Sequence, residues 1–239
     1  MKRFWLVFAV VSWSVAIAQT PSLSAGTDLN IEQSYDPTTK TLNLFGQDLT
    51  DASFDKVLPY ATVDKLVLTG TKITDASLAK LTRFPNLKIL TVGNNPKITD
   101  LGLIHIGKLK SLEELGVGET AITDVGLDHL RQLKKLRRLH IDVNPKITNK
   151  GLKALSAMSE LQKLSLGSTG ISDGDLKPLA SLKKLETLYL SHTSVSDVSL
   201  PDLLALNNLQ VLLLTGTQIS SDGVSAIRKK FPRCQVITD

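Results

Sequence analysis

The chain has 239 residues, of which 21% are charged, and its formal net charge is +5 at pH 7. This excess of positive charge is mild, so we expect neither a nucleic acid nor a membrane surface as partner. Cys234 is the only cysteine, which excludes an intramolecular disulfide.

Residues 1–18 have the pattern of a secretory signal peptide. Lys2 and Arg3 form a basic start, residues 4–15 are almost all apolar, and Ala16-Ile17-Ala18 supplies small residues at the cleavage spacing. The apolar stretch is shorter than the roughly 20 residues that span a bilayer, so we expect cleavage after Ala18 and no membrane insertion afterwards. A retained membrane anchor is the alternative. The protein would then be secreted or lie in the periplasm or cell envelope. Residues 19–38 are predicted to be a flexible leader.

A phrase of the form L-x-x-L-x-L-x-x-(T/N)-x-I-(T/S)-D-x-x-L-x-x-L-x-x-L then occurs seven times. Its copies begin at Val63, Leu87, Leu112, Leu136, Leu161, Leu185 and Leu209, so the step is nearly constant at about 24 residues. A weaker copy precedes them from about residue 42. A fixed period of this size predicts a solenoid, in which each turn buries its apolar face only against its neighbours. We therefore expect one repeat domain over residues 39–239.

Each repeat combines two periodicities. Apolar residues alternate in stretches such as Leu66-Val67-Leu68, which predicts a short strand with one face in the core. About ten residues later the spacing becomes three, as in Leu78, Leu81 and Phe84, and this predicts a helix of about ten residues. The fold class is therefore α/β, a horseshoe segment with a parallel concave sheet and convex helices. Residues 235–237 are predicted to add a closing strand.

A Thr-Asp or Ser-Asp pair precedes most of the predicted helices. Its oxygen atoms can accept the free N–H groups of the first helical turn, which predicts N-terminal caps. A column of aspartates is also compatible with a calcium ladder. Asn149 and Ser221 replace the aspartate in two repeats. Both keep the capacity to cap but lack the carboxylate, and this favours capping.

A second polar column follows the predicted strands, at Thr71, Asn95, Thr120, Asn144, Thr169, Thr193 and Thr217. Side chains stacked in this way can bond backbone groups of the loops. Both asparagines precede Pro-Lys, in the two repeats that are one residue longer than the others. The extra residue predicts two bulges on the same rim, about 10 Å apart.

These repeats resemble leucine-rich repeats, and phrases such as Leu-Gly-Val-Gly-Glu-Thr-Ala-Ile-Thr-Asp-Val-Gly-Leu carry the resemblance. The subclass that they resemble is the ribonuclease-inhibitor-like, or cysteine-containing, type, although Thr or Asn occupies the position of the defining cysteine. The resemblance covers about residues 40–237 and implies a horseshoe that binds macromolecules. The family's extracellular members in animals and plants usually have disulfide-bonded caps. Their absence from this chain suggests a bacterial exported protein.

The free face of the predicted sheet holds the candidate binding residues. Small residues at Gly116, Gly118, Ser165 and Gly167 leave room around a central group of polar side chains, with an aromatic residue as a possible anchor. The candidate ligand-binding residues are Glu114, Arg138, His140, Asp142, Lys163 and Tyr189. Hydrophilic strand residues that only face water are the alternative interpretation.

No nucleophile, acid/base or metal-ligand motif occurs in the sequence, and we expect no enzyme activity, no metal and no cofactor. The predicted function is a non-enzymatic protein-binding module that uses its concave sheet. A structural spacer or assembly unit of an envelope lattice is the alternative, and an enzyme without a recognisable motif is a more remote one.

Overall fold

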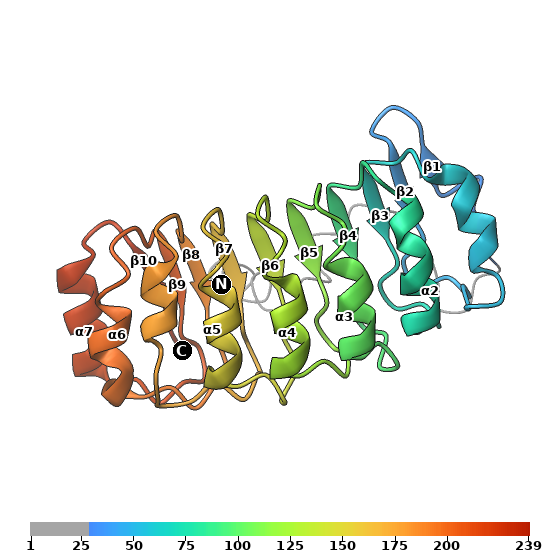
Figure 1. Cartoon of the computed structure of the whole chain (residues 1–239). Coiled ribbons are helices and arrows are strands. Elements are labelled where there is room, and N and C mark those ends of the chain that lie inside the picture. Colours follow the sequence, from blue (N-terminus) through green and yellow to red (C-terminus); the bar gives the residue numbers. More distant parts are fainter. Residues whose placement is uncertain (1–28) are drawn as a thin grey trace, which may run out of the picture.

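The structure is a computed structural model that describes residues 29–239 (Figure 1). Its strands form a single ten-stranded sheet in which spatial order equals sequence order, from β1 to β10. β1 pairs antiparallel with β2, and every later pair is parallel. Helices cover one side of the sheet along its length (Figure 1). The signal peptide and the first part of the leader, residues 1–28, lie outside the described residues.

The strands are short and keep one register throughout. Each parallel partner lies one repeat away in the sequence, as in Leu66 with Leu90 and Leu115 with Leu139. The strands are β1 Tyr35–Asp36, β2 Thr41–Asn43, β3 Lys65–Val67, β4 Ile89–Thr91, β5 Glu114–Gly116, β6 Arg138–His140, β7 Lys163–Ser165, β8 Thr187–Tyr189, β9 Val211–Leu213 and β10 Gln235–Ile237. The closing strand predicted at residues 235–237 is thus β10.

The convex helices are shorter than the ten residues that we expected, except for α7. They are η2 Phe54–Tyr60, α2 Asp75–Ala79, η3 Lys80–Arg83, α3 Asp100–Ile106, α4 Asp124–Leu130, η4 Asn149–Gly151, α5 Leu152–Leu155, η5 Lys177–Ser181, η6 Asp197–Ser199, α6 Leu200–Leu203 and α7 Ser221–Lys230, where η marks a 3-10 helix. The apolar spacing of three explains the difference. A 3-10 helix has three residues per turn, so this spacing suits it as well as it suits an α-helix.

The core lies between the sheet and the helices as one continuous column. In the repeat of β3, Val63, Leu66, Leu68 and Leu78 are all fully buried. The same positions are buried in the following repeats, so each leucine packs against its equivalents one repeat away. Burying one such side chain stabilises the fold by roughly 1.5–3 kcal/mol.

The leader predicted for residues 19–38 differs from the structure over its second half. From Leu29 the chain is folded: Ile31 is 8% exposed and joins the core, and β1 extends the sheet. The buried amide of Gln47 anchors this segment, since its Oε1 accepts from Asn30 N and its Nε2 donates to Ser34 Oγ. A turn in which Asp36 accepts from Thr38 and Thr39 leads into β2. The segment therefore caps the core at its N-terminal end.

In each Thr/Ser-Asp pair, the hydroxyl bonds within its own repeat and the carboxylate bonds to the next repeat. The hydroxyl caps its own helix, as where Thr123 Oγ1 accepts from Val125 N at 3.2 Å, and this confirms the predicted caps for the hydroxyl. The carboxylate instead reaches the next repeat: Asp100 accepts from Thr123 N and from Thr123 Oγ1, both at 2.7 Å. Asp51, Asp75, Asp124, Asp173 and Asp197 make the same two bonds. The aspartates thus form an inter-repeat ladder that capping alone did not predict.

Two of the ladder carboxyls, those of Asp51 and Asp173, have lowered pKa values. Burial would raise the pKa of Asp51, but hydrogen bonds from Ser77 and Thr74 together hold it below its usual value. The pKa of Asp173 is also lowered, first by the hydroxyl of Ser196. A carboxyl whose folded pKa lies below the unfolded value of about 3.9 stabilises the fold above that pH and loses this contribution as the pH falls through the folded pKa. Acid therefore removes the stabilisation that the ionised Asp51 and Asp173 contribute.

The second polar column also bonds as a set, with a difference between its two residue types. Asn95, which is 1% exposed, donates from Nδ2 to Leu68 O of the preceding repeat and to Val92 O of its own. The threonines bond a carbonyl of their own repeat, as where Thr193 donates to Leu190 O. In the repeats of β4 and β6, two exposed residues, Pro and Lys, occupy the loop where other repeats have one. These are the two predicted bulges.

The third residue after each of the strands β2 to β9 adopts a left-handed backbone conformation. Its N–H donates to the next repeat, as where Val143 N donates to Gly167 O at 2.8 Å, so the column extends the ladder of the sheet by one bond. Glycine occupies this column at Gly46, Gly70 and Gly216, whereas Asn94, Glu119, Val143, Ser168 and His192 adopt positive φ without being glycine. Val143, at φ 56°, is the β-branched member. Its conformation carries strain that the ladder must overcome.

We expect the Asp ladder to depend on its acceptor oxygen more than on its charge. Asp100→Ala leaves the Thr123 N–H without an acceptor and should lower the free energy of unfolding by about 1–3 kcal/mol. Asp100→Asn should cost clearly less, because Asn149 Oδ1 already accepts from Ser172 N at 3.0 Å in the equivalent place. Urea unfolding of the two variants measures the difference. Equal losses for Ala and Asn would contradict this role.

The left-handed column provides a reciprocal test of backbone strain. Val143→Gly should raise the free energy of unfolding by up to about 1 kcal/mol, because the relieved strain of about 1–2 kcal/mol exceeds the entropic cost of glycine, about 0.5–1 kcal/mol. Gly46→Val should lower it through strain alone, since Gly46 has φ 68° and a Cβ there would meet no atom within 4 Å. Thermal and urea unfolding measure both changes. Two changes of the same sign would disprove the explanation.

Candidate functional site

The register of the sheet places the predicted residues in rows on its concave side. Glu114, Arg138 and Lys163 are direct partners in successive strands and form the first row. His140, Ser165 and Tyr189 form the second row, two residues further along the strands. Asp142 follows β6. We call Glu114, Arg138, His140, Asp142, Lys163 and Tyr189 the concave cluster, and the structure brings all six into neighbouring repeats.

Two contacts join members of the concave cluster across repeats. Arg138 Nε donates to Glu114 Oε2 at 2.6 Å, and the two side chains are 42% and 17% exposed. Lys163 Nζ lies 4.9 Å from the centre of the Tyr189 ring, within range of a cation–π contact. An ion pair as exposed as this one contributes roughly 0–1 kcal/mol to stability. Arg138 is the more accessible member of this pair, whereas Glu114 is largely covered.

His140 is buried, at 4% exposure, which sequence analysis did not anticipate. Burial lowers the pKa of the imidazole to about 3, and the nearby positive charges of Lys163 and Arg138 contribute to this shift. His140 is therefore neutral at physiological pH. We expected His140 to lie in open space and to contact a ligand. The structure corrects this expectation, because a side chain this buried is not open to a ligand.

Asp142 organises the opposite end of the concave cluster. Its Oδ1 accepts from the Ser165 hydroxyl and from Gly167 N, the latter at 3.0 Å. Burial raises the pKa of this carboxyl, although the bonds from Ser165 and Gly167 act in the opposite direction. Ser165, which we counted only as a small residue that leaves space, is thus a hydrogen-bond donor. The sequence register could have shown this bond, because it places Ser165 on the strand next to the one that Asp142 follows.

Two more hydroxyls extend this polar end into the next repeats. Ser191 follows β8 and Thr215 follows β9, at the places equivalent to Asp142. Among residues 29–239, Ser191 Oγ and Thr215 Oγ1 are the buried side-chain atoms without a hydrogen-bond partner. Buried hydroxyls are normally paired. Both oxygen atoms are buried, so these hydroxyls, like His140, are not open to a ligand.

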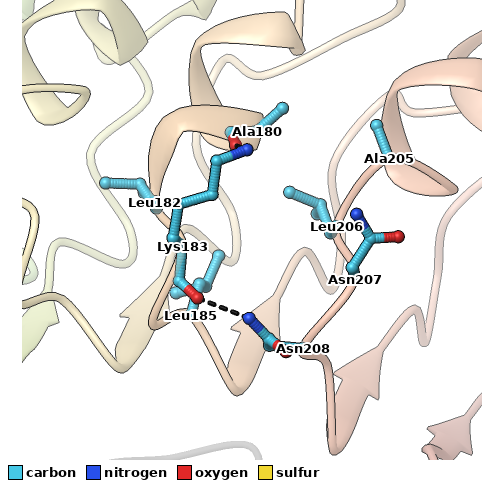
Figure 2. A pocket seen from close by; sticks show the side chains of 8 residues that line it. All are labelled: Ala180, Leu182, Lys183, Leu185, Ala205, Leu206, Asn207 and Asn208. Atoms are coloured by element: carbon cyan, nitrogen blue, oxygen red, sulfur yellow. Dashed lines mark hydrogen bonds between the residues drawn. The ribbon is translucent and has the colours of Figure 1, made fainter.

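A small pocket lies away from the concave cluster, where the convex segments return to β8 and β9 (Figure 2). Its volume is about 80 Å³, room for a few water molecules. Leu182, Leu185 and Leu206 form its apolar wall, and Asn208 Nδ2 donates to the Lys183 carbonyl at 2.5 Å (Figure 2). The wall includes no histidine or carboxylate. Lys183 is the ionisable residue among those that line it.

Within residues 29–239, no set of three or more His, Cys, Asp or Glu side chains is grouped so that it could hold a metal ion. No helix in the same range combines the length and apolarity that crossing a membrane requires.

Comparisons with known proteins agree with this architecture. A family model described as Leucine Rich repeat matches residues 132–156 and 205–227. The solved structure of internalin C2 (inlC2) from Listeria monocytogenes is 30% identical, with a TM-score of 0.66 over 84% of this chain and 80% of that one. The chain is a leucine-rich repeat protein. Its predicted fold class is thereby confirmed, whereas the cysteine-containing subclass stays a prediction.

Two further structures resemble this leucine-rich repeat protein. Internalin inlF from Listeria monocytogenes is 25% identical, with a TM-score of 0.66 over 83% of this chain. The chain spans only 53% of the length of that internalin. A leucine-rich repeat protein from Leptospira interrogans, at 21% identity and a TM-score of 0.51 over 82% of this chain and 59% of that one, shows the fold alone. Comparison with curated protein sequences gives no match. Leucine-rich repeat folds are typical of protein-binding modules.

Proposed function

We propose that this leucine-rich repeat protein is a non-enzymatic module that binds a protein partner at its concave sheet. The observation that carries the proposal is the first row of the concave cluster. Glu114, Arg138 and Lys163 present both signs of charge on three adjacent strands, with Tyr189 beside them. Rigid strands hold these groups, so a partner would not have to order them on binding.

We also propose that the protein acts outside the cytoplasm, in the secreted space or the cell envelope. The support is the sequence pattern of residues 1–18, with its basic start, apolar stretch and small residues before Gln19. With one cysteine the chain forms no intramolecular disulfide, and this is compatible with both the secreted space and the cell envelope.

Export predicts a specific mature N-terminus. When the full chain is expressed in its native host, mass spectrometry of the exported protein should show a chain that begins at Gln19, because Ala16 and Ala18 suit the signal peptidase. Ala18→Leu should leave the precursor uncleaved, since the enzyme requires a small residue there. A protein that retains Met1 in the cytoplasm would contradict the proposal.

The concave site predicts a loss of partner capture on charge reversal. Arg138→Glu with Lys163→Glu should reduce capture of the partner from an envelope or secreted fraction by about tenfold or more, because two contact charges change sign. Lys184→Glu is a matched control, since Lys184 also forms an exposed ion pair, with Glu160 at 2.7 Å, but lies outside the concave cluster. Quantitative mass spectrometry of the captured proteins measures the effect.

We expect these variants to remain folded, because the Arg138 side chain is exposed and its ion pair contributes little to stability. Thermal unfolding checks this. Equal capture by wild type, the double variant and Lys184→Glu would contradict the proposal that the partner binds at the concave cluster. Cross-links between copies of the chain alone, without a captured protein, would favour the structural spacer.

A further inference from the structure

The loops that lead from the convex helices back to the next strand concentrate positive charge on one edge of the molecule. The repeats stand side by side, so their loops lie along two opposite edges (Figure 1). We call the loops between α3 and β5 and between α4 and β6, residues 107–113 and 131–137, the return loops. Glu113 is the carboxylate in them, and it is half-buried. Their exposed cations are Lys108, Lys110, Arg131, Lys134, Lys135 and Arg137.

Hydrogen bonds join the return loops, and the loops beside them, into one surface. Arg137 N donates to Glu113 O at 2.8 Å, and Glu113 N donates to Lys88 O of the preceding loop at 2.8 Å. Lys134 Nζ donates to Ala157 O of the following loop at 3.2 Å. Every strand pair here keeps one register, so the loops stay at the same height along the strands. Their cations therefore lie at one level, on strand ends about 5 Å apart.

Most of these cations have no carboxylate partner within the described chain. Arg131 pairs with Asp128 at 3.5 Å. No ion pair among residues 29–239 involves the others, and we call them the basic patch: Lys108, Lys110, Lys134, Lys135 and Arg137. The printed bonds of Lys110 Nζ and Lys134 Nζ go to carbonyl oxygens, which do not neutralise a charge. The charge of the patch is thus available to an anion outside the protein.

The opposite edge, where the strands lead into the helices, carries the carboxylates of the Asp ladder. α4 has 7 residues, so about 10 Å of helix separates Asp124 at its start from the return loop at its end. That length exceeds the Debye length of about 8 Å at physiological salt, so the ladder carboxylates are largely screened from a partner at the basic patch. The mild net charge, from which we expected no membrane partner, is therefore the sum of two unlike edges.

We propose that the basic patch docks the protein on the surface of an anionic lipid bilayer without entering it. Loops at one level can touch a plane together, and clusters of about four to eight Lys and Arg residues bind anionic bilayers through charge. The leucines of the return loops are buried, so no exposed apolar or aromatic side chain is present there to enter the lipid or to anchor a protein partner. Contact through charge alone suits a bilayer better than a protein.

This docking goes beyond the proposed concave site and does not depend on it. The strands run from the return loops toward the opposite edge, so they would stand away from the bilayer. The concave sheet could then contact a protein partner while the basic patch holds the lipid.

Co-sedimentation with lipid vesicles tests the proposal. One set of vesicles contains equal parts of phosphatidylglycerol and phosphatidylcholine, and the other contains phosphatidylcholine alone. The full chain should bind the anionic vesicles more strongly, and added NaCl should weaken this binding. Vesicles of phosphatidylcholine alone report any binding through the apolar residues 4–15, so the difference between the two sets measures the contribution of charge.

A triple variant of the basic patch, Lys134→Gln with Lys135→Gln and Arg137→Gln, should lose most of that difference. Each basic residue near an anionic surface strengthens binding by about fivefold, so the loss of three charges should weaken binding of the anionic vesicles by about a hundredfold. The variant should keep the thermal midpoint of wild type, because the three side chains are exposed.

A matched control lies on the opposite edge. Lys97→Gln with Lys146→Gln and Lys150→Gln changes the net charge equally, and these lysines are also exposed and outside every ion pair of residues 29–239. Binding of the anionic vesicles should change by about twofold or less, because these charges lie beyond a Debye length from the docked loops.

Several results would overturn the proposal. They are equal binding by wild type and the basic-patch variant, equal losses in the two triple variants, and wild-type binding that needs no anionic lipid or resists NaCl. Binding of soluble poly-L-glutamate without binding of anionic vesicles would also overturn it, and would assign the basic patch to an acidic protein instead.

Discussion

Every turn of this solenoid buries its leucines only against the turns beside it, and the rest of the structure follows from that constraint. Leu90 packs between its equivalents Leu66 and Leu115. Successive turns must therefore keep their spacing and register without help from distant parts of the chain. A slip of one residue would turn the buried face of a strand outward.

Three sets of hydrogen bonds maintain this register at different depths. The sheet holds the concave side, the left-handed column adds one bond per repeat after each strand, and the Asp ladder joins the starts of the helices. The ladder also explains a glycine. A Cβ on Gly126 would lie 2.2 Å from Asp100 Oδ1, so the side chain must be absent for the carboxylate to reach the next repeat. Ser77 meets the same requirement differently, by donating to Asp51.

The strands and core could be predicted residue by residue, because a nearly constant period with alternating leucines has a single register. The helix type could not, since a spacing of three suits both 3-10 and α geometry. The composition of the leader concealed its folded half: a single apolar residue, Ile31, is buried in the core, and the amide of Gln47 holds the segment. A β-branched residue such as Val143 rarely adopts a left-handed backbone conformation. Its positive φ could therefore be seen only in the structure, where the neighbouring repeats hold it.

The concave cluster was predictable as a set of positions but not as a set of contacts. Register placed Arg138 between Glu114 and Lys163, yet the choice of Glu114 as partner and the burial of His140 depend on side-chain conformations. The concave cluster consists largely of residues that no ladder or core position requires.

That freedom has a physical consequence for how such a surface can change. Val125 and Lys150 occupy equivalent places at the starts of α4 and η4, so this position takes an apolar or a charged residue, and the ladder position before it takes Asp or Asn. Each repeat can therefore vary its rim and concave residues independently of its neighbours. Binding specificity in this fold is then set by which consecutive repeats carry matching departures, and the concave cluster has them in the repeats of β5 to β8.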